Sequence, residues 1–419
     1  ALYGARGANG VIIITTKNGR KGTTNVELDA RFGVNQRGVP EYDRIMDPGT
    51  YYTTFWEAVR NDYLYRTENP FELEAANAEA SNTLISDWLG YNIYDVPDNQ
   101  LVVNGALNPS AKIKYEDPTT FNDWASKLMS PKMRQEYNLS VTRGQEDSST
   151  FFSLGYLDDK GYAINTGFKR LSSRLSYNTN FNKWLRFQAS SQLALTSGNF
   201  GAGEDSQGTF SNIFFFTRAI APIYPLYAHD VDGKIVMENG EPVYDIGNAV
   251  KGVHGTRHFS ANKNIVGENE LNKDQYDRLY LVQNARADID LTHGFKFNTT
   301  FTYGFINNRA TYFLNPSMGD GNAYGGILTK NDYQTTTLNW NQVLTYDKKV
   351  GDFTLQGMLG HESYSRTHSN MGGEKKRTLD PKSLEFNTYA EITSLNSGGV
   401  TYAVEGYFGQ FTGDYLDKY

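Results

Sequence analysis

The stretch Arg170-Leu171-Ser172-Ser173-Arg174-Leu175-Ser176-Tyr177-Asn178-Thr179-Asn180-Phe181 alternates between polar and mostly apolar residues. Successive side chains of a β-strand point to opposite faces, so a period of two predicts a strand with one apolar face. Asn182-Lys183 then reverses the chain, and residues 185–195 repeat the alternation. The two segments together predict an antiparallel hairpin rather than a helix.

The same alternation recurs along the chain and predicts ten strands. Residues 281–291 and 295–305 form a second hairpin around Thr292-His293-Gly294, and residues 333–347 and 352–368 form a third. One face of these strands carries Leu, Phe, Tyr, Ala and Thr, whereas the other carries Arg, Lys, Asp, Asn and Gln. The remaining predicted strands are 24–35, 134–143, 149–158 and 400–415.

The links between these strands differ in length in a regular way. Most short links alternate with long ones, and residues 159–167 form a link of intermediate length. Transmembrane β-barrels have short turns at one end and long loops at the other, so we expect an antiparallel barrel wall. The short links are 144–148, 182–183, 292–294 and 348–351, and the long links are 36–133, 198–276, 310–332 and 369–399.

Four charged side chains stand in the middle of predicted strands, on their polar face. In a barrel this face surrounds the lumen, so we expect these side chains to line it. The alternative is that they lie on the solvent-exposed face of a sheet in a soluble protein. The lumen-facing candidates are Arg170, Arg174, Arg286 and Asp288.

The composition agrees with a barrel and excludes several other classes. The 419 residues include 29 Tyr, 24 Phe and 5 Trp, which would supply the aromatic girdles of a barrel. No run approaches the ~18 apolar residues that a membrane helix needs. The absence of Cys excludes disulfide scaffolds and thiolate zinc sites. A net charge of −7 without a basic stripe argues against nucleic acid as a partner.

The long loops contain helical signals of their own. Asp47-Pro48 has the composition of a helix start, and apolar residues follow at helical spacing up to Tyr63. A second stripe covers residues 73–88 and ends at Gly90, and a third covers 213–220. Residues 230–241 read as a hairpin. We expect these loops to pack together, and the aromatic residues that could contact a substrate there, or equally pack inside the loops, are Trp88, Tyr91, Tyr224, Tyr227, Tyr312 and Tyr324.

Signals of enzymatic chemistry are poor. The six His residues are scattered, and His254 and His258 lie in a Gly-rich polar loop rather than on a helix. Glu268 and Glu270 read as part of a charged loop and not as an acid–base pair. We find no serine-nucleophile elbow and no phosphate-binding loop. The sequence therefore predicts no catalytic residue, no metal site and no cofactor, and the protein is not expected to be an enzyme.

The opening residues differ from the rest of the chain. Leu2-Tyr3-Gly4-Ala5-Arg6-Gly7-Ala8-Asn9-Gly10-Val11-Ile12-Ile13-Ile14-Thr15-Thr16-Lys17 combines a glycine turn with a strand of the buried type. It resembles the end of the plug domain in SusC/RagA-type TonB-linked outer-membrane proteins. The residues that carry this plug motif are Gly4, Arg6, Gly7, Asn9 and Gly10.

The resemblance continues into the predicted wall. Segments 121–124, 134–141, 152–157 and 406–411 are similar to the family's first barrel strands and loops. The family commonly has Arg where Gln410 stands and an aromatic residue where Gly413 stands, which puts the lumen contacts of that strand in doubt.

The resemblance implies a fold and a division of the chain. Members close about 22 strands around a plug. Residues 1–22 would then be the end of the plug, and residues 23–419 the first part of the barrel. We accordingly interpret the chain as a fragment, with the signal peptide, the TonB box and any additional N-terminal domain upstream of Ala1.

The resemblance also implies a function. Members import oligomeric nutrients across the outer membrane of Bacteroidetes-type Gram-negative bacteria, powered by the TonB complex and paired with a SusD-like surface lipoprotein. A glycan is the expected substrate, and a peptide is the main alternative. Outer-membrane lipid would surround the barrel. Two other classes remain open, namely a passive porin and a soluble or surface-exposed glycan-binding β protein.

Overall fold

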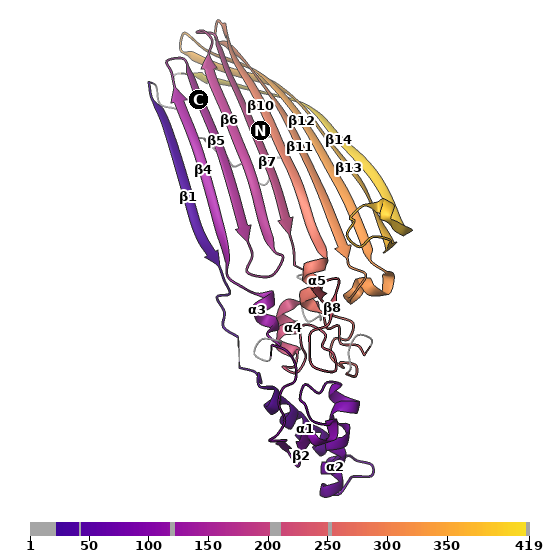
Figure 1. Cartoon of the computed structure of the whole chain (residues 1–419). Helices are drawn as coiled ribbons and strands as arrows, with labels where there is room; N and C mark the ends of the chain where they lie inside the picture. The colour runs from indigo at the N-terminus through magenta and orange to yellow at the C-terminus, as the bar shows by residue number, and fades with distance from the viewer. Residues whose placement is uncertain (1–21, 42, 118–121, 202–210, 250–253, 416–419) are drawn as a thin grey trace.

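Ten long strands form one antiparallel sheet in the computed structural model, which describes residues 22–41, 43–117, 122–201, 211–249 and 254–415 (Figure 1). The strands lie side by side in chain order, and each of the ten predicted strands is confirmed. They are β1 (Thr24–Asn35), β4 (Lys132–Gly144), β5 (Ser148–Lys160), β6 (Gly167–Asn180), β7 (Leu185–Asn199), β10 (Lys273–Thr292), β11 (Phe295–Leu314), β12 (Ile327–Val350), β13 (Phe353–Thr378) and β14 (Tyr389–Tyr415).

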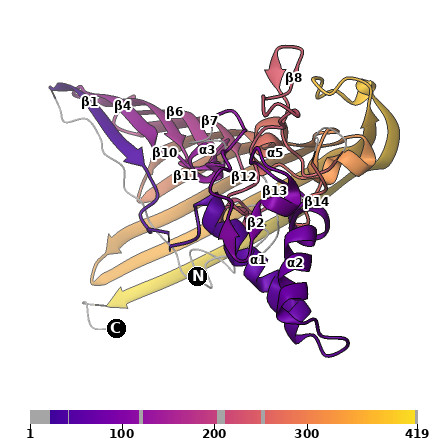
Figure 2. The ribbon, with the colours of Figure 1, turned by 60° about the horizontal axis from the view of Figure 1, so that its bottom comes forward.

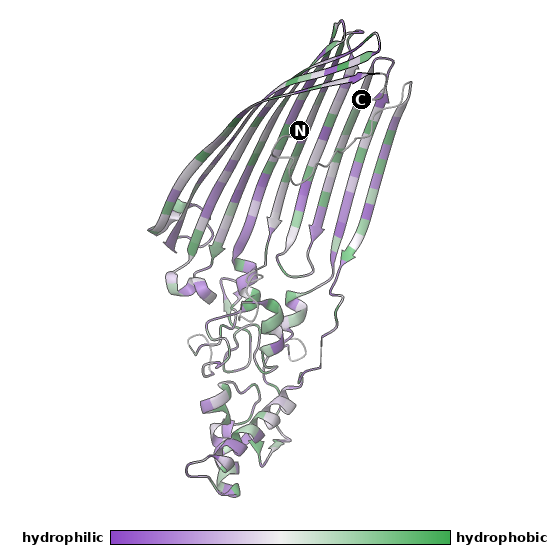
Figure 3. Ribbon diagram, turned by 180° about the vertical axis from the view of Figure 1, so that it is seen from behind, coloured by the Kyte–Doolittle hydropathy of each residue, from purple (hydrophilic) through white to green (hydrophobic). Residues whose placement is uncertain are grey.

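The register keeps the two faces of the sheet distinct. Leu171 pairs with Leu195, which pairs with Leu279, whereas their neighbours Arg170, Thr196 and Arg278 pair with one another on the opposite side. We call the side with Leu171, Leu195 and Leu279 the apolar face, and the side with Arg170 and Arg278 the polar face. Hydrophilic and hydrophobic residues alternate along the strands in Figure 3.

The later strands are much longer than the sequence pattern predicts. β12, β13 and β14 have 24, 26 and 27 residues, whereas about 9–11 residues suffice to cross a membrane. The prediction that 310–332 and 369–399 are loops is therefore wrong, because those links shrink to 315–326 and 379–388. The ladder of backbone hydrogen bonds continues where the regular alternation of polar and apolar residues has stopped, so the sequence pattern ends before the strand does.

The two ends of the sheet differ as expected. One end carries the short links 145–147, 181–184, 293–294 and 351–352, and the other carries the long links (Figures 1 and 2). Figure 2 shows that the sheet is curved across its width, with helices gathered at the end of the long links. Within the described part of the chain, no helix is both long and apolar enough to span a membrane.

The helices form where the sequence provides caps. α1 (Pro48–Tyr65) begins at Asp47, whose Oδ2 accepts a hydrogen bond from the Thr50 amide at 2.6 Å. α2 (Leu73–Thr83) continues into a π-helical turn (Leu84–Leu89) and ends at Gly90, which has a positive φ. The predicted third helix and hairpin also form, as α4 (Ile213–Ala219) and the strands β8 (Met237–Glu238) and β9 (Glu241–Pro242). Two short helices, α3 (Trp124–Leu128) and α5 (Ile265–Leu271), were not predicted.

The two longest links pack into a single body. We call the described residues of 36–131 and 200–272 the loop body. The Trp124 indole donates a hydrogen bond to the Tyr224 carbonyl at 3.0 Å, and the Tyr224 hydroxyl donates to the Leu89 carbonyl at 3.1 Å. The expectation that the loops pack on one another is confirmed by a shared core that includes Tyr52, Trp56, Leu84, Ile93, Trp124, Phe216, Ile223 and Ile265.

Candidate functional site

The predicted lumen residues lie on the polar face, in two groups. Arg170 and Arg174 stand on β6, away from Arg286 and Asp288 on β10. Arg286 pairs with Asp288 at 2.8 Å, and Asp288 also accepts a hydrogen bond from Asn298 on β11 at 2.5 Å. This pair belongs to the polar lining of a cavity of about 770 Å³ at the short-turn end of the sheet. Their role in lining a lumen stays a prediction.

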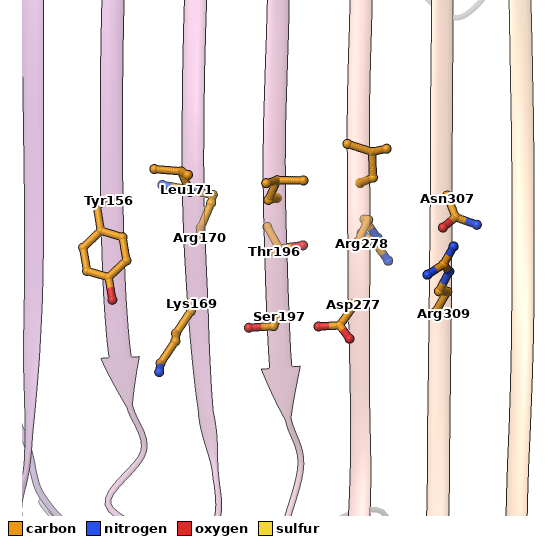
Figure 4. Close-up of a pocket in the computed structure, with 12 residues that line it drawn as sticks. Tyr156, Lys169, Arg170, Leu171, Thr196, Ser197, Asp277, Arg278, Asn307 and Arg309 are labelled. Carbon is orange, nitrogen blue, oxygen red and sulfur yellow. The ribbon is translucent and has the colours of Figure 1, made fainter. Parts of the chain in front are cut away.

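A groove of about 460 Å³ crosses β5, β6, β7, β10 and β11 (Figure 4). Lys169, Ser197, Asp277 and Arg309 pair in one row across four of these strands. This row lies on the apolar face, two residues along each strand from the row of Leu171, Leu195 and Leu279. Lys169 and Arg170 are sequence neighbours, so their side chains leave the sheet on opposite faces. The charged row therefore marks an edge of the apolar surface, on the long-loop side.

Two of the aromatic candidates are core residues of the loop body. Tyr91 is fully buried, and its hydroxyl donates to the Asp245 carboxylate at 2.9 Å. Tyr224 is 3% exposed and packs edge-on against Tyr91. Because both rings are covered by protein, we no longer propose them as substrate contacts. Packing inside the loops is the alternative that the sequence leaves open for both residues, and it explains their positions.

The other four aromatic candidates keep some access to solvent. Trp88 is 38% exposed and packs beside Phe55. Tyr324 is 49% exposed, and the Lys376 ammonium lies 4.2 Å from its ring centre. Tyr312 is 43% exposed at the long-loop end of β11, and half-buried Tyr227 packs against Tyr244. Contact of these residues with a substrate stays a prediction.

A buried ionic cluster holds the loop body together. Asp245 accepts hydrogen bonds from Tyr91 and from the Gly247 amide, and its side chain is 1% exposed. Arg257, fully buried, approaches it at 3.5 Å, and His254 approaches it at 3.6 Å while stacking on Tyr91. Burial lowers the pKa of His254, although the Asp245 charge opposes this effect. His254 is therefore a neutral ring packed inside the cluster.

Glu268 departs from its predicted setting. It lies on α5, is 3% exposed and is not part of a solvated charged loop. Burial raises its pKa to about 7, and the nearby Lys263 ammonium opposes the rise. Tyr244, in contrast, donates to exposed Glu270 two residues further on. The two carboxylates thus have different environments, which the prediction of a charged loop missed.

Few local signals in the sequence indicate these buried groups. Asn264 caps α5 through a hydrogen bond from the Gly267 amide, and this cap was a signal that could have predicted the helix. Nothing local indicates that Asp245 and Arg257 meet. The plug-motif residues Gly4, Arg6, Gly7, Asn9 and Gly10 lie outside the described residues. Within the described ranges, no group of three or more acidic or His side chains could hold a metal ion.

We compared the chain with known proteins. No family model matches the chain. Two TonB-dependent receptors of Formosa agariphila align with all of it at 21% and 23% identity. The TonB-dependent receptor SusC of Bacteroides thetaiotaomicron aligns with all of it at 21% identity. The chain spans about a third of the length of these relatives (36%, 34% and 36%).

A solved structure shows the same fold. The RagAB peptide transporter matches 99% of this chain with a TM-score of 0.64 at 18% sequence identity, and the match covers 43% of the transporter chain. These relatives and neighbours are receptors and transporters by name rather than enzymes. The ten-stranded sheet thus has the fold of part of the RagAB transporter's chain. The chain is homologous to the TonB-dependent outer-membrane receptors of the SusC and RagA type, as its motifs indicated.

Proposed function

We propose that this chain forms part of the wall and extracellular loops of a TonB-dependent importer for an oligomeric nutrient. The observation that supports this most is the combination of a two-faced sheet with one large folded body at its long-loop end. The relatives that align with the whole chain are named TonB-dependent receptors. We also propose that residues 1–22 end the plug and that residues 23–419 belong to the barrel.

A glycan is our first candidate for the cargo. Exposed aromatic rings such as Trp88 and Tyr324 offer flat apolar surfaces for sugar rings, and Arg and Asn side chains can hydrogen-bond to hydroxyl groups. A peptide is the second candidate, because the RagAB neighbour is named a peptide transporter. We propose a SusD-like lipoprotein as the surface partner and the TonB complex as the energy source.

Uptake by cells that carry the full-length gene tests the proposal. Deletion of the TonB box in the full-length protein should abolish uptake of labelled nutrient oligomers while the barrel remains in the outer membrane. Unchanged uptake would contradict TonB dependence and favour a passive porin. Purification of the full-length protein as a monodisperse species without detergent would contradict the barrel and favour a soluble glycan-binding protein. Co-purification with a surface lipoprotein tests the proposed partner.

A further inference from the structure

A small cavity lies where α5 meets the long-loop ends of β10 and β11. Its volume is about 120 Å³, and its lining includes Phe200, Glu268, Asn272, Asp274, Tyr312 and Asp320. Asp274 on β10 pairs with Tyr312 on β11. Asp274 lies two residues before Tyr276 on the same strand, so both side chains belong to the polar face. The cavity therefore opens among groups of the polar face, at the end of the sheet where a substrate would enter.

One side of this cavity already holds an ammonium group. The Lys263 Nζ donates to Asp320 Oδ1 at 2.7 Å and to Ser211 Oγ at 3.1 Å. It remains 4.0 Å from Glu268 Oε2, which is beyond hydrogen-bond distance. The protein's own ammonium group thus satisfies Asp320 and stays beyond hydrogen-bond distance of the Glu268 carboxylate.

The Glu268 carboxylate is fixed in place and incompletely satisfied. Its Oε1 is buried and has no hydrogen-bond partner in the part of the chain that the structure describes. A Cβ at position 319 would lie 2.2 Å from its Oε2, so the carboxylate packs closely against the backbone of Gly319. A buried carboxylate oxygen without a donor is costly, and such atoms are found with a ligand, a water or a function.

The cations near Glu268 already have other partners. Lys263 lies on Asp320, and the Lys273 Nζ donates to the Glu270 carbonyl at 3.3 Å. The rings of Phe200 and Tyr312 provide apolar walls. A carboxylate beside aromatic rings is the environment that favours a cation.

We propose that this cavity binds a primary ammonium group of the imported oligomer, with Glu268 as its carboxylate partner. The inference rests on the proposed import function and defines its substrate more narrowly. A primary ammonium group carries three donors and fits a cavity of this size. Both an unblocked peptide and an oligomer of amino sugars carry such a group, so the shared chemistry, rather than one polymer, defines the site.

The ionisation of Glu268 gives the proposal a distinct signature. Burial holds its pKa at about 7, with Lys263 lowering and Asp320 raising it, so part of the population is protonated at neutral pH. An arriving ammonium group favours the ionised carboxylate, and the proton leaves to solvent. A hydroxyl group can bind to either form, and its binding requires no such release.

Calorimetric titration of the full-length protein in detergent tests the site. The probes are tetra-alanine against N-acetylated tetra-alanine, and a glucosamine tetramer against an N-acetylglucosamine tetramer. Each free amine should bind at least about tenfold more tightly than its acetylated form. At pH 7, buffers of different ionisation enthalpy should reveal proton release with tetra-alanine, whose amine is already mostly protonated, and none with its acetylated form. The peptide and sugar pairs show which source of ammonium the protein prefers.

Two variants assign the effect to the residue. Glu268→Gln keeps the shape of the side chain and removes its charge, so it should abolish both the preference for free amines and the proton release. Glu270→Gln, on the same helix but exposed, should keep both. Equal binding of free and acetylated probes to the unaltered protein would overturn the proposal, as would full preference in Glu268→Gln. Uptake of neutral oligomers by the unaltered protein alongside such a result would leave the import function intact. The absence of TonB-dependent uptake of any oligomer by the unaltered protein would refute that function instead.

Discussion

Gly90 shows how a single residue lets two long loops meet. Its φ is +72°, and its carbonyl accepts a hydrogen bond from the Gly255 amide at 2.6 Å. A Cβ there would lie 2.4 Å from the Thr256 carbonyl oxygen. The position therefore requires glycine for two reasons, namely the left-handed backbone and the contact with the facing loop.

Comparison of Gly90→Ala with Gly240→Ala separates the cost of backbone strain from the cost of the lost contact between the loops. Gly240→Ala meets only backbone strain, because its φ is +85° and no atom lies within 4 Å of a Cβ. We expect Gly240→Ala to cost about 1 kcal/mol of unfolding free energy and Gly90→Ala about 2–4 kcal/mol. Urea unfolding followed by tryptophan fluorescence measures both. Equal losses would show that the loops do not pack at Gly90 as described.

His254 gives the loop body a dependence on pH. Its folded pKa lies below the ordinary value of 6.5, so the unfolded chain binds a proton more readily. The stability that this ring contributes is complete above pH 6.5 and is lost as the pH falls below it. The charged groups that act on the ring are Asp245, Arg257 and Lys114.

Replacement of His254 by Phe should reduce the acid sensitivity of the loop body. The variant keeps a ring to stack on Tyr91 and removes the titrating group. Unfolding midpoints at pH 7 and pH 5 should differ less in His254→Phe than in the unaltered protein. His258→Phe, at an exposed position, is the control and should behave like the unaltered protein. Glu268 has a raised pKa and acts in the opposite direction, but equally in all three proteins.

At the scale of elements, the alternation of side chains could be predicted and tertiary burial could not. The pattern from Leu171 to Phe181 specifies a strand because every second residue needs the same surroundings. Asp47 predicts a helix start because its side chain satisfies a local amide. Glu268 packs against Gly319, fifty-one residues away in the sequence (319 − 268), and no local pattern reports such a contact. The strand ends beyond 310 were missed for the related reason that backbone pairing continues without a polarity pattern.

The two faces of β10 predict opposite responses to a new charge. Leu281 pairs with Leu193 and Phe305 on the apolar face, whereas Val282 pairs with Gln192 and Gly304 on the polar face. Leu281→Arg should destabilise the protein in lipid vesicles by about 2–4 kcal/mol, because arginine is placed against lipid. Val282→Arg should cost much less. Denaturant unfolding in vesicles measures both, and equal costs would contradict the assignment of the faces.

At the scale of the whole molecule, one curved sheet carries both an apolar face and the folded loop body. The sheet order runs from β1 to β14, and these two strands do not pair with each other in the described structure. In the proposed full-length receptor, further strands would continue the wall from these edges, since a lipid bilayer does not tolerate unpaired strand edges. The loop body then stands over the entrance, with its buried core preserving its shape.

The central claim is that this sheet crosses the outer membrane with its apolar face toward lipid. The chain contains no Cys, so single spin labels can be placed on Cys substituted at each position from 279 to 289 in the full-length protein in bilayers. Accessibility to oxygen, which concentrates in lipid, and to a water-soluble nickel complex is then measured. The account predicts a period of two, with lipid exposure at 279, 281, 283, 285, 287 and 289 and none at the even positions. Equal access of the nickel complex to odd and even positions would contradict it.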